Sequence, residues 1–284
     1  MEIKSVSVIG AGVMGHGIAQ VIAQAGISVT LRDVKEEFVQ KGIKNIEQFL
    51  DQGIKRGRLT EEQRKETLAR IKGVIDLKEA VQGVDLIIEA IVEDLEEKKQ
   101  LFRQLDELCP PKVIFASNTS YMSITELAAA TKRPDRFIGM HWFNPPQLMR
   151  LIEIARAAST TEQTVNAIVE LSKKVGKTPA VCKDSPGFVV NRILQPWYNE
   201  GMRLLDEGVA TAQDIDTALK VGGGFRMGPL ELRDLVGLDT GLKGTMAIYE
   251  QLRDDKFRPP QCLIKKVQAG HYGRKTKKGF YEYE

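Results

Sequence analysis

The chain has 284 residues, 42% of them hydrophobic, and its 41 basic and 38 acidic side chains leave a formal net charge of +3. This length allows one or two globular domains with a substantial core. The near balance of charge does not support non-specific binding of nucleic acid, and no apolar run reaches the ~20 residues of a membrane-spanning helix. The first strand leaves no room for a signal peptide, so we expect a cytoplasmic protein.

The cysteines and histidines are scattered along the chain: Cys109, Cys182, Cys262, His16, His141 and His271. An odd number of cysteines without a C-x-x-C pair predicts a reducing compartment and no disulfide framework. The spacing of both residue types also predicts that the protein holds no metal.

The first segment has the pattern of a dinucleotide-binding turn. An apolar strand over residues 6–9 leads into a G-x-G-x-x-G motif, and residues 16–25 then have the pattern of a helix. In such a turn the glycines bring the backbone close to a pyrophosphate, which the N-terminus of the helix faces. The predicted contacts are Gly10, Gly12, Val13, Met14 and Gly15.

A second strand over residues 27–31 ends near Asp33, eighteen residues beyond Gly15. An acidic side chain at that place accepts hydrogen bonds from the ribose hydroxyls of NAD. The alternative is a glycine-rich strand–helix turn without a ligand. The strand, turn, helix and acid in this order favour NAD over that alternative.

Two charged amphipathic helices follow, over residues 35–56 and 60–72, and Thr60 with Gln63 predicts a capping box for the second. Short apolar runs come next, at residues 84–89, 113–116, 137–140, 150–155 and 179–182. Helical patterns separate several of them, at residues 95–108, 124–130 and 162–175. Continuous apolarity is typical of a sheet covered on both faces. We therefore predict an α/β fold, with a Rossmann-type, doubly wound domain over residues 1–185 that contains a helical hairpin insertion at about 35–72.

From Pro186 onward the strand patterns cease. The remaining segments have helical patterns, at residues 188–208, 212–221, 228–235 and 238–252. The Ser-Pro-Gly sequence at 185–187 breaks the chain between the two kinds of pattern. We therefore predict an all-helical C-terminal domain over residues 186–284, with a role in substrate binding and dimerisation.

A proton acceptor for a nicotinamide enzyme is expected at the carboxyl ends of the strands, where ligands bind in open α/β sheets. His141 follows the strand pattern at 136–140, and Glu153 lies twelve residues on, inside the apolar run 151–154. A buried carboxylate needs a partner, and His141 would provide one, as in a catalytic triad. Spacing alone leaves this open, because a core histidine and an edge carboxylate fit equally well.

Two further polar residues are candidates for the same edge. Ser120 closes the run Ala-Ser-Asn-Thr-Ser at 116–120, although capping of the next helix is the more frequent use of such residues. Asn191 begins the helical domain and could equally be a surface residue of its helix. Neither residue indicates a site by itself.

Nine short motifs follow one another along the chain: GAGVMG (10–15), EAIVE (89–93), ASNTS (116–120), GMHWFNP (139–145), DSPGFVVNR (184–192), MGP (227–229), DLVGLD (234–239), GRKT (273–276) and GFY (279–281). In these motifs the whole chain resembles the L-3-hydroxyacyl-CoA dehydrogenase family, and most closely its short bacterial 3-hydroxybutyryl-CoA dehydrogenases. So many ordered motifs make a chance match very improbable.

The resemblance implies a role for each matching residue. His141 matches the general base for the 3-hydroxyl and Glu153 its carboxylate partner. Ser120 and Asn191 match side chains that bind the 3-oxygen of the substrate or orient the histidine. The matching cofactor contacts are Glu93, Lys98, Ser120, Asn144 and Lys275.

The resemblance also implies a place for the coenzyme A group of the substrate. Lys55 and Arg56, with Arg58 close by, fall where relatives hold coenzyme A. The alternative is an ordinary solvated helix end, where basic residues favour the C-terminal dipole.

The resemblance implies oxidation of a (3S)-3-hydroxyacyl-CoA, short-chain such as 3-hydroxybutyryl-CoA, to the 3-oxoacyl-CoA by NAD, and the reverse reaction. We also expect a homodimer, because ~95 helical residues bury little core alone. One alternative is a β-hydroxyacid dehydrogenase of the 6-phosphogluconate type, but residues 186–199 lack the lysine that it needs. The other is a non-catalytic NAD-binding relative, which has no need for the polar set.

Overall fold

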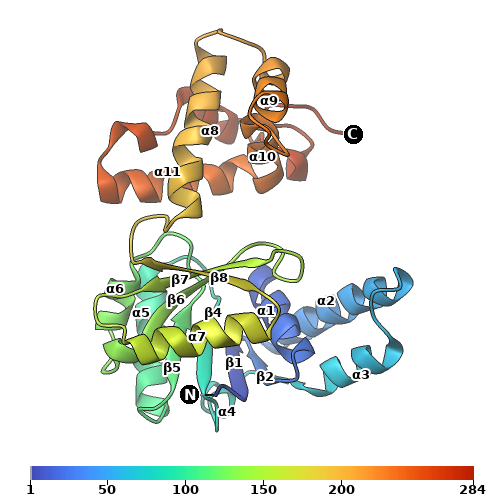
Figure 1. Cartoon of the computed structure of the whole chain (residues 1–284), viewed down its shortest axis with the longest axis vertical. Helices are drawn as coiled ribbons and strands as arrows, with labels where there is room; N and C mark the ends of the chain where they lie inside the picture. The colour runs from blue at the N-terminus through green and yellow to red at the C-terminus, as the bar shows by residue number, and fades with distance from the viewer. Residues whose placement is uncertain (1) are drawn as a thin grey trace. The chain divides into compact units, whose positions relative to one another are not determined.

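The computed structural model describes residues 2–284. It divides into two compact units, Met1–Ser185 and Pro186–Glu284 (Figure 1). The first unit contains every strand that forms a sheet among the described residues. The second is helical, so the predicted α/β fold with an all-helical C-terminal part is confirmed.

The eight strands of the first unit form one sheet in the order β3-β2-β1-β4-β5-β6-β7-β8. All neighbouring strands pair in parallel except β6 and β7, which are antiparallel. An order that reverses between β1 and β4 is that of a doubly wound dinucleotide-binding sheet. The strands are β1 (Ser5–Ile9), β2 (Ser28–Arg32), β3 (Ile71–Val74), β4 (Leu86–Glu89), β5 (Ile114–Ser117), β6 (Phe137–Trp142), β7 (Leu151–Arg156) and β8 (Thr178–Lys183).

Helices cover both faces of this sheet. Ile18 of α1 and Ile168 of α7 pack with Val8 and Ile88 of the strands on one face, where α7 lies in front of the strands in Figure 1. On the other face, Phe102 of α5 packs against the rings of two strand phenylalanines. Burial of each such side chain contributes roughly 1.5–3 kcal/mol. The helices are α1 (Val13–Gln24), α2 (Glu36–Lys55), α3 (Glu61–Ala69), α4 (Leu77–Ala80), α5 (Leu95–Leu108), α6 (Ile124–Ala129) and α7 (Glu162–Lys174).

The α2–α3 hairpin extends to one side of the first unit (Figure 1). The predicted capping box is present, since the Thr60 side chain accepts from Gln63 N and the Gln63 side chain accepts from Thr60 N. The prediction of a helix up to residue 72 is wrong, however, because α3 ends at Ala69 and the edge strand β3 follows. Pairing with β2 satisfies the backbone there, and Gly73 has a low helix propensity.

The second unit consists of α8 (Val190–Asp206), α9 (Ala212–Val221), α10 (Pro229–Val236), α11 (Leu238–Leu252) and α12 (Gln261–Gln268). Helix α8 begins later than predicted, because Phe188 has a positive φ of 49°. Helix α12 was not predicted. The carboxylate of buried Asp234 accepts hydrogen bonds from Phe280 N, Tyr281 N and the Tyr283 hydroxyl, each at 2.9 Å. These bonds hold the C-terminal segment against α10.

Among residues 2–284, no helix has both the length and the apolar character needed to cross a membrane.

Candidate active site

The glycines of the turn between β1 and α1 separate into two kinds. Gly10 has a φ of 104°, which only glycine adopts readily, and a Cβ on Gly15 would overlap the carbonyl group of Gly10. The fold itself requires these two glycines. A Cβ on Gly12 would meet no other atom within 4 Å. The missing side chain of Gly12 therefore serves no packing in the protein and leaves the backbone open to a phosphate group.

Asp33 directly follows β2 and lies beside this turn. Its Oδ2 accepts a hydrogen bond from Ala11 N at 2.7 Å, and its Oδ1 accepts one from Val34 N at 2.7 Å. The carboxylate is thus held at the carboxyl edge of the sheet, next to the backbone that the glycines leave open. An acidic side chain beside an open glycine turn is the arrangement with which doubly wound sheets receive the adenosine half of a dinucleotide.

The antiparallel pairing of β6 and β7 places His141 directly opposite Glu153. Their side chains are buried, and His141 Nδ1 lies 2.9 Å from Glu153 Oε2. A carboxylate only accepts, so in the neutral imidazole Nδ1 carries the proton and Nε2 presents a lone pair. Ser120 Oγ, just beyond β5, lies within hydrogen-bond distance of this Nε2, at 3.1 Å. The structure therefore brings together the histidine, the glutamate and the serine that the sequence analysis singled out.

A polar chain leads from Ser120 into the protein. Ser120 N donates to Glu93 Oε1 at 2.9 Å, and Glu93 Oε2 lies 3.4 Å from Lys98 Nζ. Lys98 is only 1% exposed, and its ammonium donates to Glu89 Oε1 at 2.5 Å. The two predicted cofactor contacts Glu93 and Lys98 thus belong to one hydrogen-bonded set with Ser120.

Glu89 is a member of this set that the sequence analysis missed. Its Oε1 also accepts from Ile91 N at 2.8 Å, and its Oε2 accepts from Ser117 Oγ at 2.6 Å. Complete burial raises the pKa of Glu89, against the lowering effect of the Lys98 ammonium. The available signal was a carboxylate at the end of an otherwise apolar strand.

The remaining predicted residues of the first unit lie on loops and a helix end. Asn144 is exposed in the loop 143–150 between β6 and β7. Nearby, Asn118 is buried and its Oδ1 accepts from Trp142 N at 2.9 Å, which joins the ends of β5 and β6. Lys55 and Arg56 are exposed at the C-terminus of α2.

Two predicted residues belong to the second unit. Asn191 lies half-buried in the first turn of α8. Lys275 follows α12, and its Nζ donates to Asp239 at 2.5 Å. Burial alone would raise the pKa of Asp239, but the hydrogen bonds from Lys275 and Thr240 N outweigh it and hold the pKa below the usual range.

The cysteines do not provide a nucleophile. Burial raises the pKa of Cys109 and of Cys182 to about 11 and that of Cys262 to about 12, so all three remain thiols at neutral pH. Across residues 2–284, no group of histidine, cysteine and acidic side chains is arranged to hold a metal ion.

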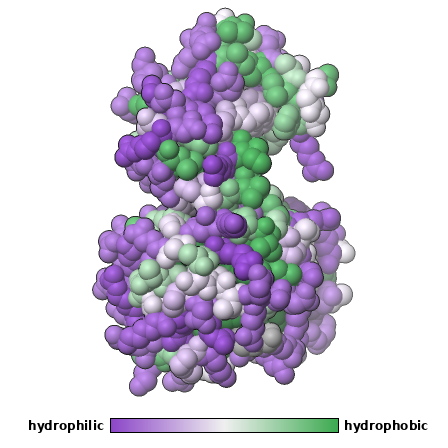
Figure 2. Space-filling view, turned by 60° about the vertical axis from the view of Figure 1, so that its left-hand side comes forward, coloured by the Kyte–Doolittle hydropathy of each residue, from purple (hydrophilic) through white to green (hydrophobic). Residues whose placement is uncertain are grey.

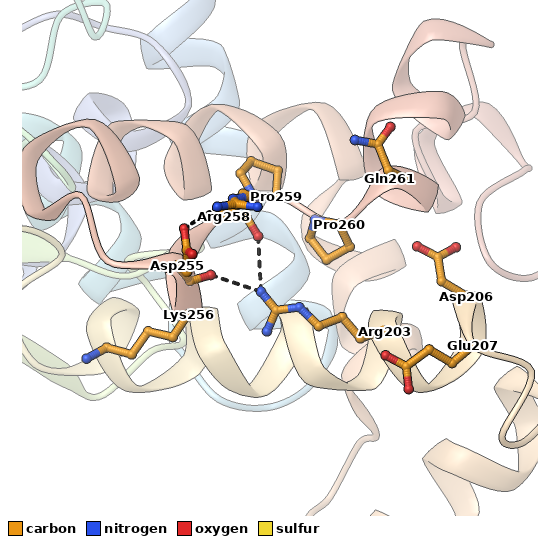
Figure 3. Close-up of a pocket in the computed structure, with 9 residues that line it drawn as sticks. All are labelled: Arg203, Asp206, Glu207, Asp255, Lys256, Arg258, Pro259, Pro260 and Gln261. Atoms are coloured by element: carbon orange, nitrogen blue, oxygen red, sulfur yellow. Dashed lines mark hydrogen bonds and ion pairs between the residues drawn. The ribbon is translucent and has the colours of Figure 1, made fainter.

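A groove of about 610 Å³ in the second unit shares no residue with the predicted site (Figure 3). Two of its polar side chains already have partners: the Arg203 guanidinium donates to the carbonyl oxygens of Asp255 and Arg258, and Asp206 accepts from Cys262 N. The groove is lined by Arg203, Asp206, Glu207, Asp255, Lys256, Arg258, Pro259, Pro260 and Gln261.

The sheet order, the open glycine turn and Asp33 define a dinucleotide-binding protein of the Rossmann class, with a histidine–carboxylate pair at the edge of the sheet where its ligands bind. The chain belongs to the 3-hydroxyacyl-CoA dehydrogenase family. Residues 5–185 match the NAD binding domain of that family, and residues 187–283 match its C-terminal domain. The protein is thus an NAD-dependent oxidoreductase with 3-hydroxyacyl-CoA dehydrogenase activity.

Individual relatives are similar over the full length. A probable 3-hydroxybutyryl-CoA dehydrogenase of Bacillus subtilis is 44% identical over 284 residues, which cover 100% of this chain and 99% of that protein. A protein of the same description from Deinococcus radiodurans is 47% identical over 276 residues, 97% and 99% of the two chains. The crystal structure of (S)-3-hydroxybutyryl-CoA dehydrogenase from Ralstonia eutropha superimposes with a TM-score of 0.96 at 44% identity, and the match covers 100% of both chains.

The two kinds of glycine should respond differently to substitution. We expect Gly12→Ala to lower stability by no more than about 1 kcal/mol, the cost of a changed helix cap, but to weaken NADH binding ~10-fold or more, because the new methyl group would occupy the phosphate position. Gly15→Ala, the matched control, should lower the free energy of unfolding by about 1–3 kcal/mol. NADH fluorescence titration and urea unfolding measure the two effects. Unchanged NADH affinity in Gly12→Ala would show that this backbone is not the phosphate site.

Proposed function

We propose that this protein interconverts a short-chain (3S)-3-hydroxyacyl-CoA, such as 3-hydroxybutyryl-CoA, and the corresponding 3-oxoacyl-CoA. The observation that carries the proposal is the bonded set of Glu153, His141 and Ser120 at the carboxyl edge of a NAD-binding sheet. Support for the short acyl chain comes from the full-length relatives named above. Support for the (3S) configuration comes from the Ralstonia eutropha enzyme among them, whose name specifies the (S) substrate.

In the oxidation direction, NAD when bound supplies the acceptor for the hydride of C3. His141 Nε2 takes the proton of the 3-hydroxyl group, since Nδ1 is occupied by the bond to Glu153. The carboxylate of Glu153 stabilises the imidazolium that forms. When the substrate is bound, the Ser120 hydroxyl, which lies 3.1 Å from His141 Nε2, is proposed to turn to the 3-oxygen and leave that nitrogen free to take the proton. Asn191 is proposed to bind the same oxygen.

The cofactor contacts of this proposal are those of the sequence analysis. Glu93 and Lys98 are proposed to bind the nicotinamide half of NAD, because Glu93 accepts a hydrogen bond from Ser120 N and pairs with Lys98. Asn144 and Lys275 complete the proposed set. The glycines of the turn and Asp33 hold the adenosine half.

Purified wild-type protein should consume NADH when acetoacetyl-CoA is added, which absorbance at the NADH band measures.

His141→Ala should lower kcat about 10²–10⁴-fold with NADH affinity kept, because only proton transfer is removed. Glu153→Gln should lower kcat more than NADH affinity, since it removes the charge that favours imidazolium. His271→Ala, a histidine in the second unit, should leave kcat unchanged. A wild type that does not turn over acetoacetyl-CoA would contradict the proposed short-chain substrate, and near-native turnover of His141→Ala would remove the base assignment.

We further propose that Lys55 and Arg56 bind the phosphates of coenzyme A. Lys55→Ala with Arg56→Ala should raise KM for acetoacetyl-CoA and weaken its salt dependence, with kcat unchanged. Lys173→Ala with Lys174→Ala is the matched control, a basic pair at the C-terminus of another helix. A thioester that lacks the nucleotide should react equally well with all of these variants. An unchanged KM would leave the two cations as an ordinary helix end.

We also propose that the second unit forms a homodimer. Apolar side chains are exposed on its helices, among them Ile193 of α8, 66% exposed, and Val221 of α9, 81% exposed; Figure 2 shows such hydrophobic surface among hydrophilic side chains. Exposed apolar surface of this kind marks protein interfaces. Light scattering of the eluting protein should give about twice the mass of one chain, and Val221→Glu should lower that mass. A wild type that elutes as a monomer would contradict the proposal.

A further inference from the structure

Lys177 is a buried cation that no role assigned so far explains. It directly precedes β8 and is 9% exposed. Its Nζ donates to Pro146 O at 2.6 Å and to Met149 O at 2.7 Å. Burial lowers the pKa of Lys177, so the fold places an ammonium group where its charge is disfavoured. Its hydrogen-bond acceptors are these two backbone carbonyls, and it also lies 5.8 Å from the ring centre of Trp142.

Both carbonyls belong to the loop 143–150, which joins the strand of His141 to the strand of Glu153. Pro145 and Pro146 have no N–H group, so the loop is short of donors for its own carbonyls. Within it, Pro145 O accepts from Leu148 N and from Met149 N, each at 3.0 Å. Lys177 supplies the donors that the prolines cannot provide.

The same loop is also fixed to α1. Gln147 Nε2 donates to the buried side chain of Gln20 at 3.1 Å. Pro146 and Gln147 lie so close to Gly17 that a Cβ there would approach them to 2.8–3.0 Å. Residues 145–149 are thus held from two sides, by α1 and by Lys177, while Asn144 immediately before them stays exposed.

We propose that Lys177 is a positioning residue for the dehydrogenase reaction, which holds the loop between β6 and β7 in the one arrangement that presents Asn144 to the nicotinamide. This inference rests on the proposed function. A reacting group must be held within about 0.5 Å of its productive place, and a displacement of about 1 Å can lower the rate by 10²-fold. Lys177 touches no reacting atom in this scheme and acts through the loop.

Arg133 offers a matched control, because it is a buried cation with the same chemistry at the other edge of the sheet. Its guanidinium donates to the carbonyl oxygens of Cys109 at 2.8 Å and Pro110 at 2.5 Å, ahead of the amino end of β5. It also pairs with Asp106. Arg133→Met should therefore destabilise the fold without changing the arrangement of the loop 143–150.

The experiment measures kcat, KM for NADH and thermal stability, with acetoacetyl-CoA as substrate. We expect Lys177→Met to lower kcat about 10–100-fold, Lys177→Arg to restore most of it, and Arg133→Met to lower stability with kcat unchanged. In the background of Asn144→Ala, Lys177→Met should lower kcat little further, because both changes remove the same contact. If Lys177→Met does not fold, Lys177→Gln, which keeps a shorter donor, should show the same loss of kcat in part.

The outcomes separate this inference from the proposed function. A wild type without turnover overturns both. With an active wild type, the inference is overturned if Lys177→Met and Lys177→Gln lose stability but keep kcat, as Arg133→Met should. It is also overturned if Asn144→Ala keeps full activity, or if the losses of kcat in the double variant multiply.

Discussion

The antiparallel pairing of β6 with β7 decides where the two proposed reactive side chains meet. Because β7 runs against β6, its amino end lies at the sheet edge where β6 ends, and Glu153 comes to lie opposite His141. A parallel strand would need a long crossover and would bring its amino end to the opposite edge. One reversal of strand direction thus gives the imidazole a buried carboxylate, and the loop that makes the reversal carries Asn144.

Most of the fold could be predicted because its signals are local. The apolar runs, the glycine turn and the break at residues 185–187 are each visible in a few consecutive residues. The failures depend on distant partners. Residues 71–74 form a strand because β2 lies beside them, and α12 is short, with Leu263 its buried residue. At four and eight residues, both segments are too short to show a clear periodicity.

The candidate site divides in the same way. Motif spacing and family resemblance identified His141, Glu153 and Ser120, and geometry shows that they are bonded to one another. The sequence analysis missed Glu89 and Lys177. Glu89 contacts Ser117 and Lys177 contacts Pro146, and these pairs come together only in the folded sheet. A buried charge in a sequence looks like an exposed one, and its environment becomes visible only when its partners are known.

The two outermost strands of the sheet bear on how the protein behaves in a crowded solution. An open edge offers unpaired backbone groups to any other extended chain, and such edges promote aggregation. Here β3 is only four residues long and carries exposed Lys72. At the other end, β8 contains Pro179, which has no N–H to donate, and ends at exposed Lys183. The eight-stranded sheet therefore ends in a short charged strand on one side and in a strand with a proline on the other. Neither edge offers a strand of another copy much to pair with, so a sheet of this width can hold its ligands without adding the strands of other molecules.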